Sequence, residues 1–600
     1  VRSVRVVTVD GEMLDLAKHH PDDPGTAGRL ARGLTEIKTQ YQSCIDQLAD
    51  APPARTGYRL DGVFDEDGRV DLAKFLVGTQ GTLALFVEAT VDTEPIPSHR
   101  AVVMLFFHRL ESAARCAVRS LEFGPVACDL IGRRLLGIAR ETEQQFERIL
   151  PREAEAMLLL ELQGESLDEL NVRTKILRTE LMRGTDSAFA SNTATDKEQR
   201  DQFWAISRRV TPRLSRLKGP GMPIPFTEDI AIAPERLPEA LADIQKTLRD
   251  NECTATIFGH AGHGQLHIRP FIDLSSTGER KKIRRISEMI AEVVWKHGGQ
   301  LAVEHAAGLS RSALLPKQFG DYWPAMGQIK RLFDPHHRLN PGKLFGAVLQ
   351  KPDENVRPIG ESIEVSSDNR TLISANERIV QASRLTNSAV PELPVLQQWS
   401  PAKMIDDVAQ SCNGCARCRT TAGSERQCPV FRTMRHEESS PRAKANLLRG
   451  VLSGKIAVEA LAGDKAKSVA DLCFNCHQCR LDCPASVDVP RLMVESKANH
   501  YLVNGLKLSD WLLTRLDRFY EIAGRIPRVT NFLIRNTASR AMLERFLGIA
   551  RGRKLPSFAT RSFARWAAQN KLQRNARQQS HKICYFVDAY ATWNDPEPVS

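Results

Sequence analysis

Two groups of closely spaced cysteines constrain this chain more than any other feature. The first run is Cys412-x2-Cys415-x2-Cys418-x9-Cys428-Pro429, and the second is Cys473-x2-Cys476-x2-Cys479-x3-Cys483-Pro484. Three thiolates at this spacing can converge on one face of an iron–sulfur cubane, and the fourth cysteine, followed by proline, typically ligates the other cluster. The pattern therefore predicts two [4Fe–4S] clusters that exchange their fourth ligands.

The expected ligand sets follow from that exchange. The first cluster would be bound by Cys412, Cys415, Cys418 and Cys483, and the second by Cys473, Cys476, Cys479 and Cys428. Zinc sites usually take cysteines in pairs rather than triplets, which makes zinc the weaker interpretation. Structural disulfides are uncommon in a long chain that shows no secretion signal. The x9 interval of the first run departs from the tight x3 spacing of the second.

Length and composition bound the architecture. At about 150 residues per domain, 600 residues predict three or four domains. A hydrophobic content of 42% with 26% charged residues is typical of globular proteins and excludes a disordered chain. No apolar run approaches the ~18–20 residues that span a bilayer. We therefore expect a cytoplasmic protein with, at most, peripheral contact with the inner face of a membrane.

The net charge of +11 is concentrated in one segment. Residues 501–582 hold 17 Lys and Arg against 4 Asp and Glu, so the rest of the chain is close to neutral. Leu and Phe recur in this segment at helix-like spacing, and it carries no DNA-binding motif. It is interpreted as a basic helical connector, and no nucleic-acid partner is predicted.

The pattern of apolar residues predicts an α+β region followed by an all-α region. Strands are expected over 101–107, 156–162 and 254–260, and helices over 26–48 and 279–297. Residues 350–400 are polar and lack a clear period, which is typical of a linker. From residue 401 the chain turns helical, and a strand-like run at 582–590 suggests the start of a further domain.

A second constellation combines histidines and a carboxylate. GHAGHGQLH places His260 and His267 around a glycine turn, and AVEHAAG contains Glu304 and His305. Two imidazoles and a carboxylate are a standard set for a divalent metal with open positions, which would leave His305 as a base. From spacing alone, polar residues satisfied within a turn are an equally good interpretation.

Several segments together resemble the FAD-linked oxidases of the vanillyl-alcohol-oxidase type, in the branch of the D-2-hydroxy-acid dehydrogenases. The resemblance rests on LVGTQGTLALFVEAT (76–90), FGHAGHGQLHIRP (258–270), AVEHAAG (302–308) and RLNPGKL (338–344). PIPFTEDIAIAPERL (223–237) and SPRAKANLLRG (440–450) are similar to large fused dehydrogenases that carry flavin and iron–sulfur domains on one chain.

The resemblance implies roles for individual residues. His260, His267 and Glu304 would bind a divalent metal, zinc, and His305 would be the base. Arg269 would clamp a substrate carboxylate, which a guanidinium matches bidentately. Flavin contacts are implied through the backbone and hydroxyl groups of Gly78, Thr79, Gly81 and Thr82, with Asn340 near the ring. The departures from the family pattern are Gln80, Ala84, His263, Gln265 and Ala306.

The resemblance also implies a domain organisation for the chain. It consists of a partial FAD-binding domain (1–95), an α/β cap or substrate domain (96–349), a linker (350–400), a two-cluster ferredoxin-like domain (401–500), the basic connector (501–580) and the start of a cysteine-rich domain (581–600). The family's pyrophosphate-binding loop would precede residue 1, so the chain is expected to be a fragment.

The implied activity is oxidation of a D-2-hydroxy acid, such as D-lactate, glycolate or D-2-hydroxyglutarate, to the 2-oxo acid. His305 would accept the hydroxyl proton while hydride passes to FAD. Electrons would then move through both clusters to a protein or quinone acceptor. The alternative function is a non-catalytic electron-transfer module with a vestigial flavin domain.

Overall fold

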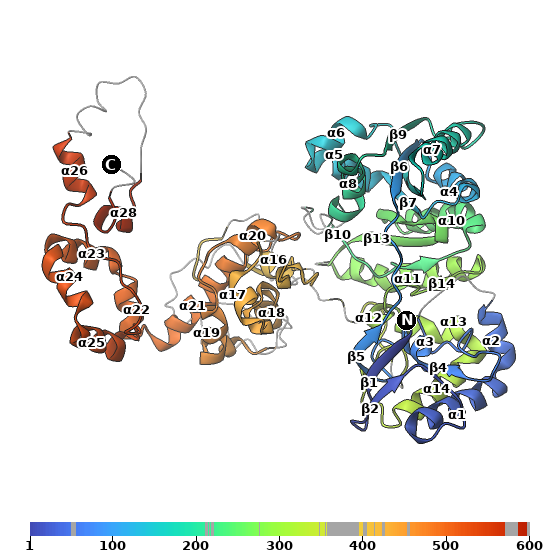
Figure 1. Ribbon diagram of the computed structural model, residues 1–600, viewed down its shortest axis with the longest axis horizontal. Coiled ribbons are helices and arrows are strands. Elements are labelled where there is room, and N and C mark those ends of the chain that lie inside the picture. Colours follow the sequence, from blue (N-terminus) through green and yellow to red (C-terminus); the bar gives the residue numbers. More distant parts are fainter. Residues whose placement is uncertain are drawn as a thin grey trace.

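A computed structural model describes most of the chain (Figure 1). The described residues are 1–49, 56–210, 214, 217, 221–274, 276–346, 349–354, 356, 395–399, 405–412, 414–422, 426–452, 456–570 and 586–596. Most of the expected linker at 350–400 therefore lies outside them.

The first unit is built on a small antiparallel sheet. Its strands β1 (Ser3–Val7), β2 (Met13–Leu16) and β5 (Leu85–Thr90) lie in the order β2-β1-β5, and β3 (Lys18–His19) pairs with β4 (Val70–Asp71) beside it. The helices are α1 (Gly25–Gln40), α2 (Gln42–Ala49), α3 (Leu72–Leu76), α12 (Gly308–Arg311), α13 (Leu315–Phe319) and α14 (Trp323–Phe333).

This unit has one core that two distant parts of the chain build together. Val6 and Leu34 pack in the same cluster as Phe319 and Ile329. The domain boundary expected at 349 stays a prediction, although Ala302, Ala307 and the apolar residues of α13 and α14, which precede it, pack in the first core. From the sequence, the apolar faces of α13 and α14 predict that these helices are buried, but they do not predict which of the two cores contains them.

The cap is a nine-stranded sheet covered by helices on both faces. Its path is β14-β11-β13-β12-β7-β8-β6-β9, with β10 paired to β13, and all these pairings are antiparallel. The strands are β6 (His99–Phe107), β7 (Ala127–Gly132), β8 (Ala156–Gly164), β9 (Ala190–Ala194), β10 (Gly221–Pro223), β11 (Ile230–Ala231), β12 (Ala255–His260), β13 (Gln265–Asp273) and β14 (Gln300–Leu301).

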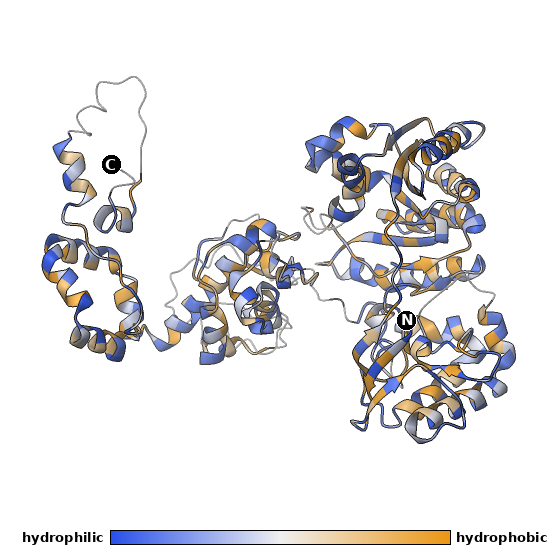
Figure 2. Ribbon diagram, viewed as in Figure 1, coloured by the Kyte–Doolittle hydropathy of each residue, from blue (hydrophilic) through white to orange (hydrophobic). Residues whose placement is uncertain are grey.

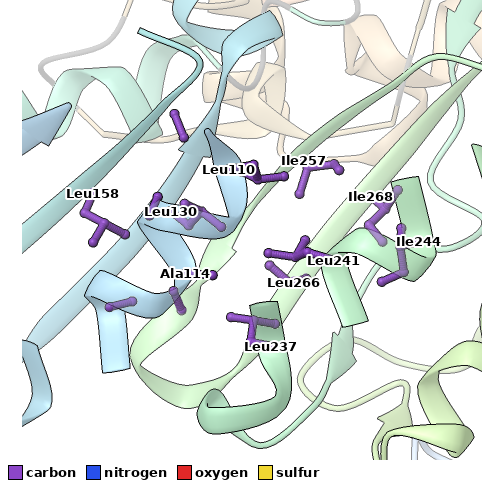
Figure 3. Packing of buried hydrophobic residues seen from close by; sticks show 14 of the residues in the cluster. Leu110, Ala114, Leu130, Leu158, Leu237, Leu241, Ile244, Ile257, Leu266 and Ile268 are labelled. Carbon is purple, nitrogen blue, oxygen red and sulfur yellow. The ribbon is translucent and has the colours of Figure 1, made fainter. Parts of the chain in front are cut away.

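Burial on both faces explains the continuous apolar runs of the central strands. In β6, Val103 and Leu105 face the cluster under α4 (Leu110–Ser120), α7 (Leu167–Leu181), α10 (Leu237–Asp250) and α11 (Thr277–Lys296), part of which Figure 3 shows. Met104 and Phe106 face the opposite cluster, under α5 (Arg133–Thr142), α6 (Gln144–Ile149) and α8 (Lys197–Ala205). The strands expected over 101–107, 156–162 and 254–260 are confirmed, as are the helices over 26–48 and 279–297.

The cysteine-rich region is helical, as predicted. Its helices are α16 (Ile405–Gln410), α17 (Pro429–Met434), α18 (Pro441–Leu452), α19 (Asp464–Asp471), α20 (Gln478–Asp482) and α21 (Val489–Asn504). Leu448 and Leu492 lie in its small core together with Cys479. The predicted α+β region followed by an all-α region is confirmed.

The basic connector forms helices with little burial. It contains α22 (Leu508–Leu513), α23 (Leu516–Arg525), α24 (Pro527–Arg535), α25 (Thr537–Leu547) and α26 (Phe563–Gln569), which continue the chain beyond the end of α21 (Figure 1) and mix hydrophilic with hydrophobic residues (Figure 2). Within the described residues of 501–570, only Gly524, Arg540 and Ser562 are buried. A search of the described residues finds no helix long and apolar enough to cross a membrane.

The strand expected over 582–590 is not found in its described part. Residues 582–585 lie outside the described residues, and from Ala589 the chain forms helix α28 (Ala589–Trp593). The side chain of Asp588 accepts a hydrogen bond from the backbone N–H of Ala591, which stabilises the start of this helix. The apolar run KICYFVDAY is too short for its period to separate strand from helix.

Lys330 and Asp334 form a buried ion pair at the end of α14. Lys330 is 1% exposed, and its Nζ donates to Asp334 Oδ2 at 2.7 Å and to the Thr82 and Leu339 carbonyls. Changing Lys330 to Met leaves Asp334 buried without its cation and should lower the free energy of unfolding by about 3–5 kcal/mol. Urea unfolding measures this, with the exposed Lys317→Met as the control. Equal stabilities of the two variants would contradict it.

Candidate active site

The histidines lie on a hairpin at one edge of the cap. Strand β12 ends at His260, a short turn follows, and β13 carries His267 opposite Phe258. Gly264 closes the turn with φ +70°, and a Cβ there would lie 1.6 Å from the carbonyl oxygen of Ile232. Only glycine fits this position, so the close approach of β12 and β13 to β11 depends on it.

A buried carboxylate holds the Glu304–His305 turn against this hairpin. Asp229 is fully buried and accepts hydrogen bonds from the backbone N–H of Glu304 at 3.0 Å and of His305 at 2.8 Å. It also accepts from Gln265 Nε2 at 3.0 Å, and that amide donates to Glu304 Oε2 at 2.9 Å. The side chains of Asp229 and Gln265 thus fix Glu304 relative to the histidines.

The structure brings His260, His267 and Glu304 together. One ligand atom from each lies within 4.8 Å of the others. Burial lowers the pKa of His267 to about 4, so its imidazole is neutral, as a metal ligand must be. Its Nδ1 has no hydrogen-bond partner among the described residues and lies 3.6 Å from Glu228 Oε1. Two imidazoles and a carboxylate at this separation are a donor set that fits a divalent cation.

Asp129 on β7 orients the first of these ligands. Its Oδ1 lies 2.7 Å from Nδ1 of His260, and this hydrogen bond raises the pKa of His260. A carboxylate bound to one ring nitrogen leaves the other facing outward, which is the usual support for a metal-binding histidine. Residue spacing could not connect Asp129 with His260, because 131 residues separate them in the sequence.

A second donor set competes for the same histidine. Glu228, His267 and His305 also offer ligand atoms within 4.8 Å of one another. Both oxygens of Glu228, however, accept hydrogen bonds from Arg269, at 2.7 and 2.8 Å. This guanidinium already neutralises the carboxylate, whereas Glu304 has no such cation among the described residues, so the set with Glu304 is the better cation site.

The guanidinium of Arg269 is not free to clamp a substrate carboxylate, because Glu228 already binds it. Its Nε and one Nη face Glu228, and its guanidinium carbon lies 5.4 Å from the centre of the Phe258 ring. Glu228 and Asp229 lie in the PIPFTEDIAIAPERL segment, but their roles were not foreseen. Two adjacent acids within an apolar run were the available signal, since acids are rarely buried without partners.

His305 packs against His267 but is not part of the favoured donor set of His260, His267 and Glu304. Its ring stacks on His267 with centres 5.0 Å apart, and its side chain is 49% exposed. Its Nδ1 lies 3.7 Å from Glu228 Oε1, so Nε2 is the nitrogen turned away from that carboxylate. The neighbouring His263 is exposed and joins neither donor set.

Three of the four segments that carry the resemblance, 76–90, 302–308 and 338–344, contact one another. Asn340 Nδ2 donates to the Gln80 carbonyl at 2.7 Å, and Gln80 Oε1 accepts from the backbone N–H of Gly308. The hydroxyls of Thr79 and Thr82 are buried and donate to carbonyls within their own loop, so they stabilise the loop rather than face outward.

Backbone openness at this loop fits a flavin ligand. Gly78 and Gly81 adopt φ +85° and +67°, which glycine tolerates best. No heavy atom lies within 4 Å of where a Cβ of Gly81 would be, so that backbone is accessible. Every residue of β5, which follows the loop, is exposed.

The eight cysteines of the two runs lie close together, and their division into two crossed sets stays a prediction. The thiols of Cys412, Cys415 and Cys483 interact electrostatically with that of Cys418, whose pKa burial raises to about 11. Cys479 has Cys428, Cys473 and Cys476 as such neighbours, and also Cys483. One cavity is lined by the four cysteines of the first set together with Cys479.

The spread of the thiols fits a cluster rather than a single zinc ion. Around one zinc, with Zn–S near 2.3 Å, tetrahedral geometry places the sulfurs about 3.8 Å apart. In the described part of the chain, no three of these thiols fall within 4.8 Å of one another. A four-iron cubane holds its ligands farther apart, so it matches this spacing better.

The support that Asp129 gives to His260 can be tested by substitution. Changing Asp129 to Asn removes the carboxylate that orients His260, and zinc affinity should fall about 10- to 100-fold. Competition with a chromophoric chelator measures the affinity. The matched control is Asp186→Asn, which removes an acid bound to Ser112 and Arg115 elsewhere in the cap. Equal affinities of the two variants would show that Asp129 does not support a metal ligand.

Comparisons with known proteins match two regions of the chain to family models. Residues 96–344 match the family model "FAD linked oxidases, C-terminal domain", and residues 408–487 match the "4Fe-4S dicluster domain". The chain is 24% identical to the D-2-hydroxyglutarate dehydrogenase of Escherichia coli K12, over all of this chain and 62% of the relative. It is 26% identical to the Pseudomonas putida KT2440 enzyme of the same name, over 80% of this chain and 49% of the relative.

A further relative matches about half of the chain. The glycolate oxidase subunit GlcD of Bacillus subtilis 168 is 26% identical over 51% of this chain and 63% of the relative. The chain thus spans roughly half to three-fifths of the D-2-hydroxyglutarate dehydrogenases. Residues 96–344 thus form a domain of the FAD-linked oxidase C-terminal type, and residues 408–487 form a domain of the 4Fe-4S dicluster type.

Proposed function

We propose that this chain oxidises a D-2-hydroxy acid to the 2-oxo acid and passes the electrons to a bound pair of [4Fe–4S] clusters. The observation that carries the proposal is the convergence of His260, His267 and Glu304 beside the exposed ring of His305. Metal ligands and an adjacent unligated imidazole are what removal of a hydroxyl proton needs.

The chain's own residues divide the work. His260, His267 and Glu304 would hold a divalent cation, zinc in our proposal, against which the substrate's hydroxyl and carboxylate are oriented. His305 would accept the hydroxyl proton at Nε2, the ring nitrogen that does not face Glu228. Stacking of His305 on His267 fixes the ring plane, so the proton acceptor stays beside the metal ligands.

The loop around Gly81, closed by Asn340, would bind the flavin through its backbone. When bound, the metal polarises the substrate, FAD takes up the hydride, and the clusters carry electrons singly. The cysteine sets described above would hold two clusters. The substrate is proposed from the D-lactate, glycolate and D-2-hydroxyglutarate class, and the acceptor is a protein or a quinone.

The experiment that tests this function changes the base. His305→Ala should abolish turnover of D-2-hydroxy acids while the visible absorbance of the clusters is unchanged, because His305 is remote from the cysteines in sequence and in packing. His263→Ala, an exposed histidine of the same turn region, is the matched control and should keep activity. Turnover retained by His305→Ala would discard its role as base. Wild-type protein with clusters but no turnover would favour the electron-transfer module instead.

The exchange of cluster ligands can be tested separately. Cys483→Ser should destroy the cluster bound by Cys412, Cys415 and Cys418 and spare the other, although Cys483 follows the second cysteine run. Iron analysis should then show loss of about half the iron. Cys44→Ser, a cysteine outside both sets, should lose none. If Cys483→Ser instead perturbs the cluster of its own run, the crossed assignment is wrong.

A further inference from the structure

A buried lysine lies between the two cysteine sets. Lys444 on α18 is 1% exposed, and its Nζ donates to the carbonyl of Ser439 at 2.6 Å. The thiol of Cys428 lies 3.9 Å from that same carbonyl oxygen. One backbone oxygen therefore joins the ammonium group to a ligand of the second cysteine set.

The charged neighbours of Lys444 are thiols rather than carboxylates. Its electrostatic partners are Cys428, Cys473 and Cys479 of the second set, followed by Cys418 of the first. Within the described residues no carboxylate pairs with its Nζ. Burial lowers the pKa of Lys444, and deprotonated cysteines would oppose that effect. A buried ammonium needs an anion nearby, and the ligands of the two clusters are what surrounds it.

Lys330, the other buried lysine among the described residues, shows the contrast. Lys330 is equally buried but pairs with Asp334, which neutralises it permanently. Lys444 has no such partner, so its charge acts on the cysteine sets. A cluster bound by four thiolates is anionic and gains a further negative charge on reduction. A fixed cation beside it stabilises the reduced form more than the oxidised form.

We propose that Lys444 is a positioning residue shared by the two clusters, which raises the reduction potential of both, and more strongly that of the Cys428, Cys473, Cys476 and Cys479 cluster. The proposal rests on the proposed presence of two clusters. In the one-electron reduction of each cluster, the electron comes from the reduced flavin in turnover and from dithionite in the test. Lys444 gains or loses no proton in this step.

The order of the neighbours gives the proposal its specific signature. The Ser439 carbonyl that binds the Lys444 ammonium lies 3.9 Å from the sulfur of Cys428, and of the other cysteines that act on Lys444 two belong to the second set and one to the first. Loss of the charge should therefore lower both potentials unequally. A defect that merely loosens α18 would not favour the second cluster in this way, because α18 also contributes Arg442 and Ala445 to the cavity of the first set.

The test is a potentiometric titration of the purified, cluster-loaded chain, followed by EPR. Lys444→Gln keeps a donor for the Ser439 carbonyl but removes the charge. It should shift the reduction equilibrium of the second cluster about tenfold, which is ~59 mV for one electron, to lower potential, and that of the first cluster less. Lys467→Gln is the matched control, since Lys467 lies in the same region but pairs with Asp471. Its potentials should stay at the wild-type values.

Two further outcomes decide the proposal. Unchanged potentials in Lys444→Gln, or a shift confined to the first cluster, would overturn it. If Lys444→Gln does not retain iron, the Lys444→Arg variant is measured instead. Loaded clusters in Lys444→Arg would show that the charge is required. Loss of iron from both variants would show that the shape of the side chain alone matters, and would overturn the proposal. Wild-type protein that binds no pair of clusters would instead refute the proposed function, before any variant is compared.

Discussion

The candidate active site depends on the buried carboxylate of Asp229. Its oxygens accept hydrogen bonds from two consecutive backbone N–H groups, those of Glu304 and His305, and from the amide of Gln265. Its backbone pairs with Leu266 and Ala302. One residue thus ties the hairpin that carries His267 to the turn that carries the expected base. Strand β11 already pairs with β13 and β14, and the side chain of Asp229 additionally fixes the turn that follows β14.

The site lies where the chain passes from one core to the other. Leu301 belongs to the core of the cap, and Ala302 to the core of the first unit. Glu304 and His305 follow directly, and the Thr56 hydroxyl donates to the carbonyl of His305. Ligand sites commonly form at such junctions between cores. The cap supplies the histidines and the first unit supplies the flavin-binding loop, so the substrate would be held between the two.

Sequence patterns predicted the residues whose spacing is local and missed those that act across the fold. The strand over 254–260, which ends at His260, was foreseen from its apolar pattern. The two crossed cysteine sets, with Cys428 and Cys483 exchanged, stay a prediction. Asp129, Glu228 and Asp229 were not foreseen, because no spacing connects them to the histidines that they support. Arg269 was expected to be a substrate clamp, but only the structure could show that Glu228 occupies its guanidinium. The return of α13 and α14 to the first core was likewise invisible in the sequence.

The location of the bound cation tests this account most directly, because the two donor sets share His267 but give His305 opposite roles. Anomalous diffraction at the zinc edge from crystals of the zinc-loaded chain locates the ion. We expect one peak bound by His260, His267 and Glu304, at zinc–ligand distances of about 2.0–2.2 Å. A peak bound instead by Glu228, His267 and His305 would make His305 a ligand, and the proposed base would be lost.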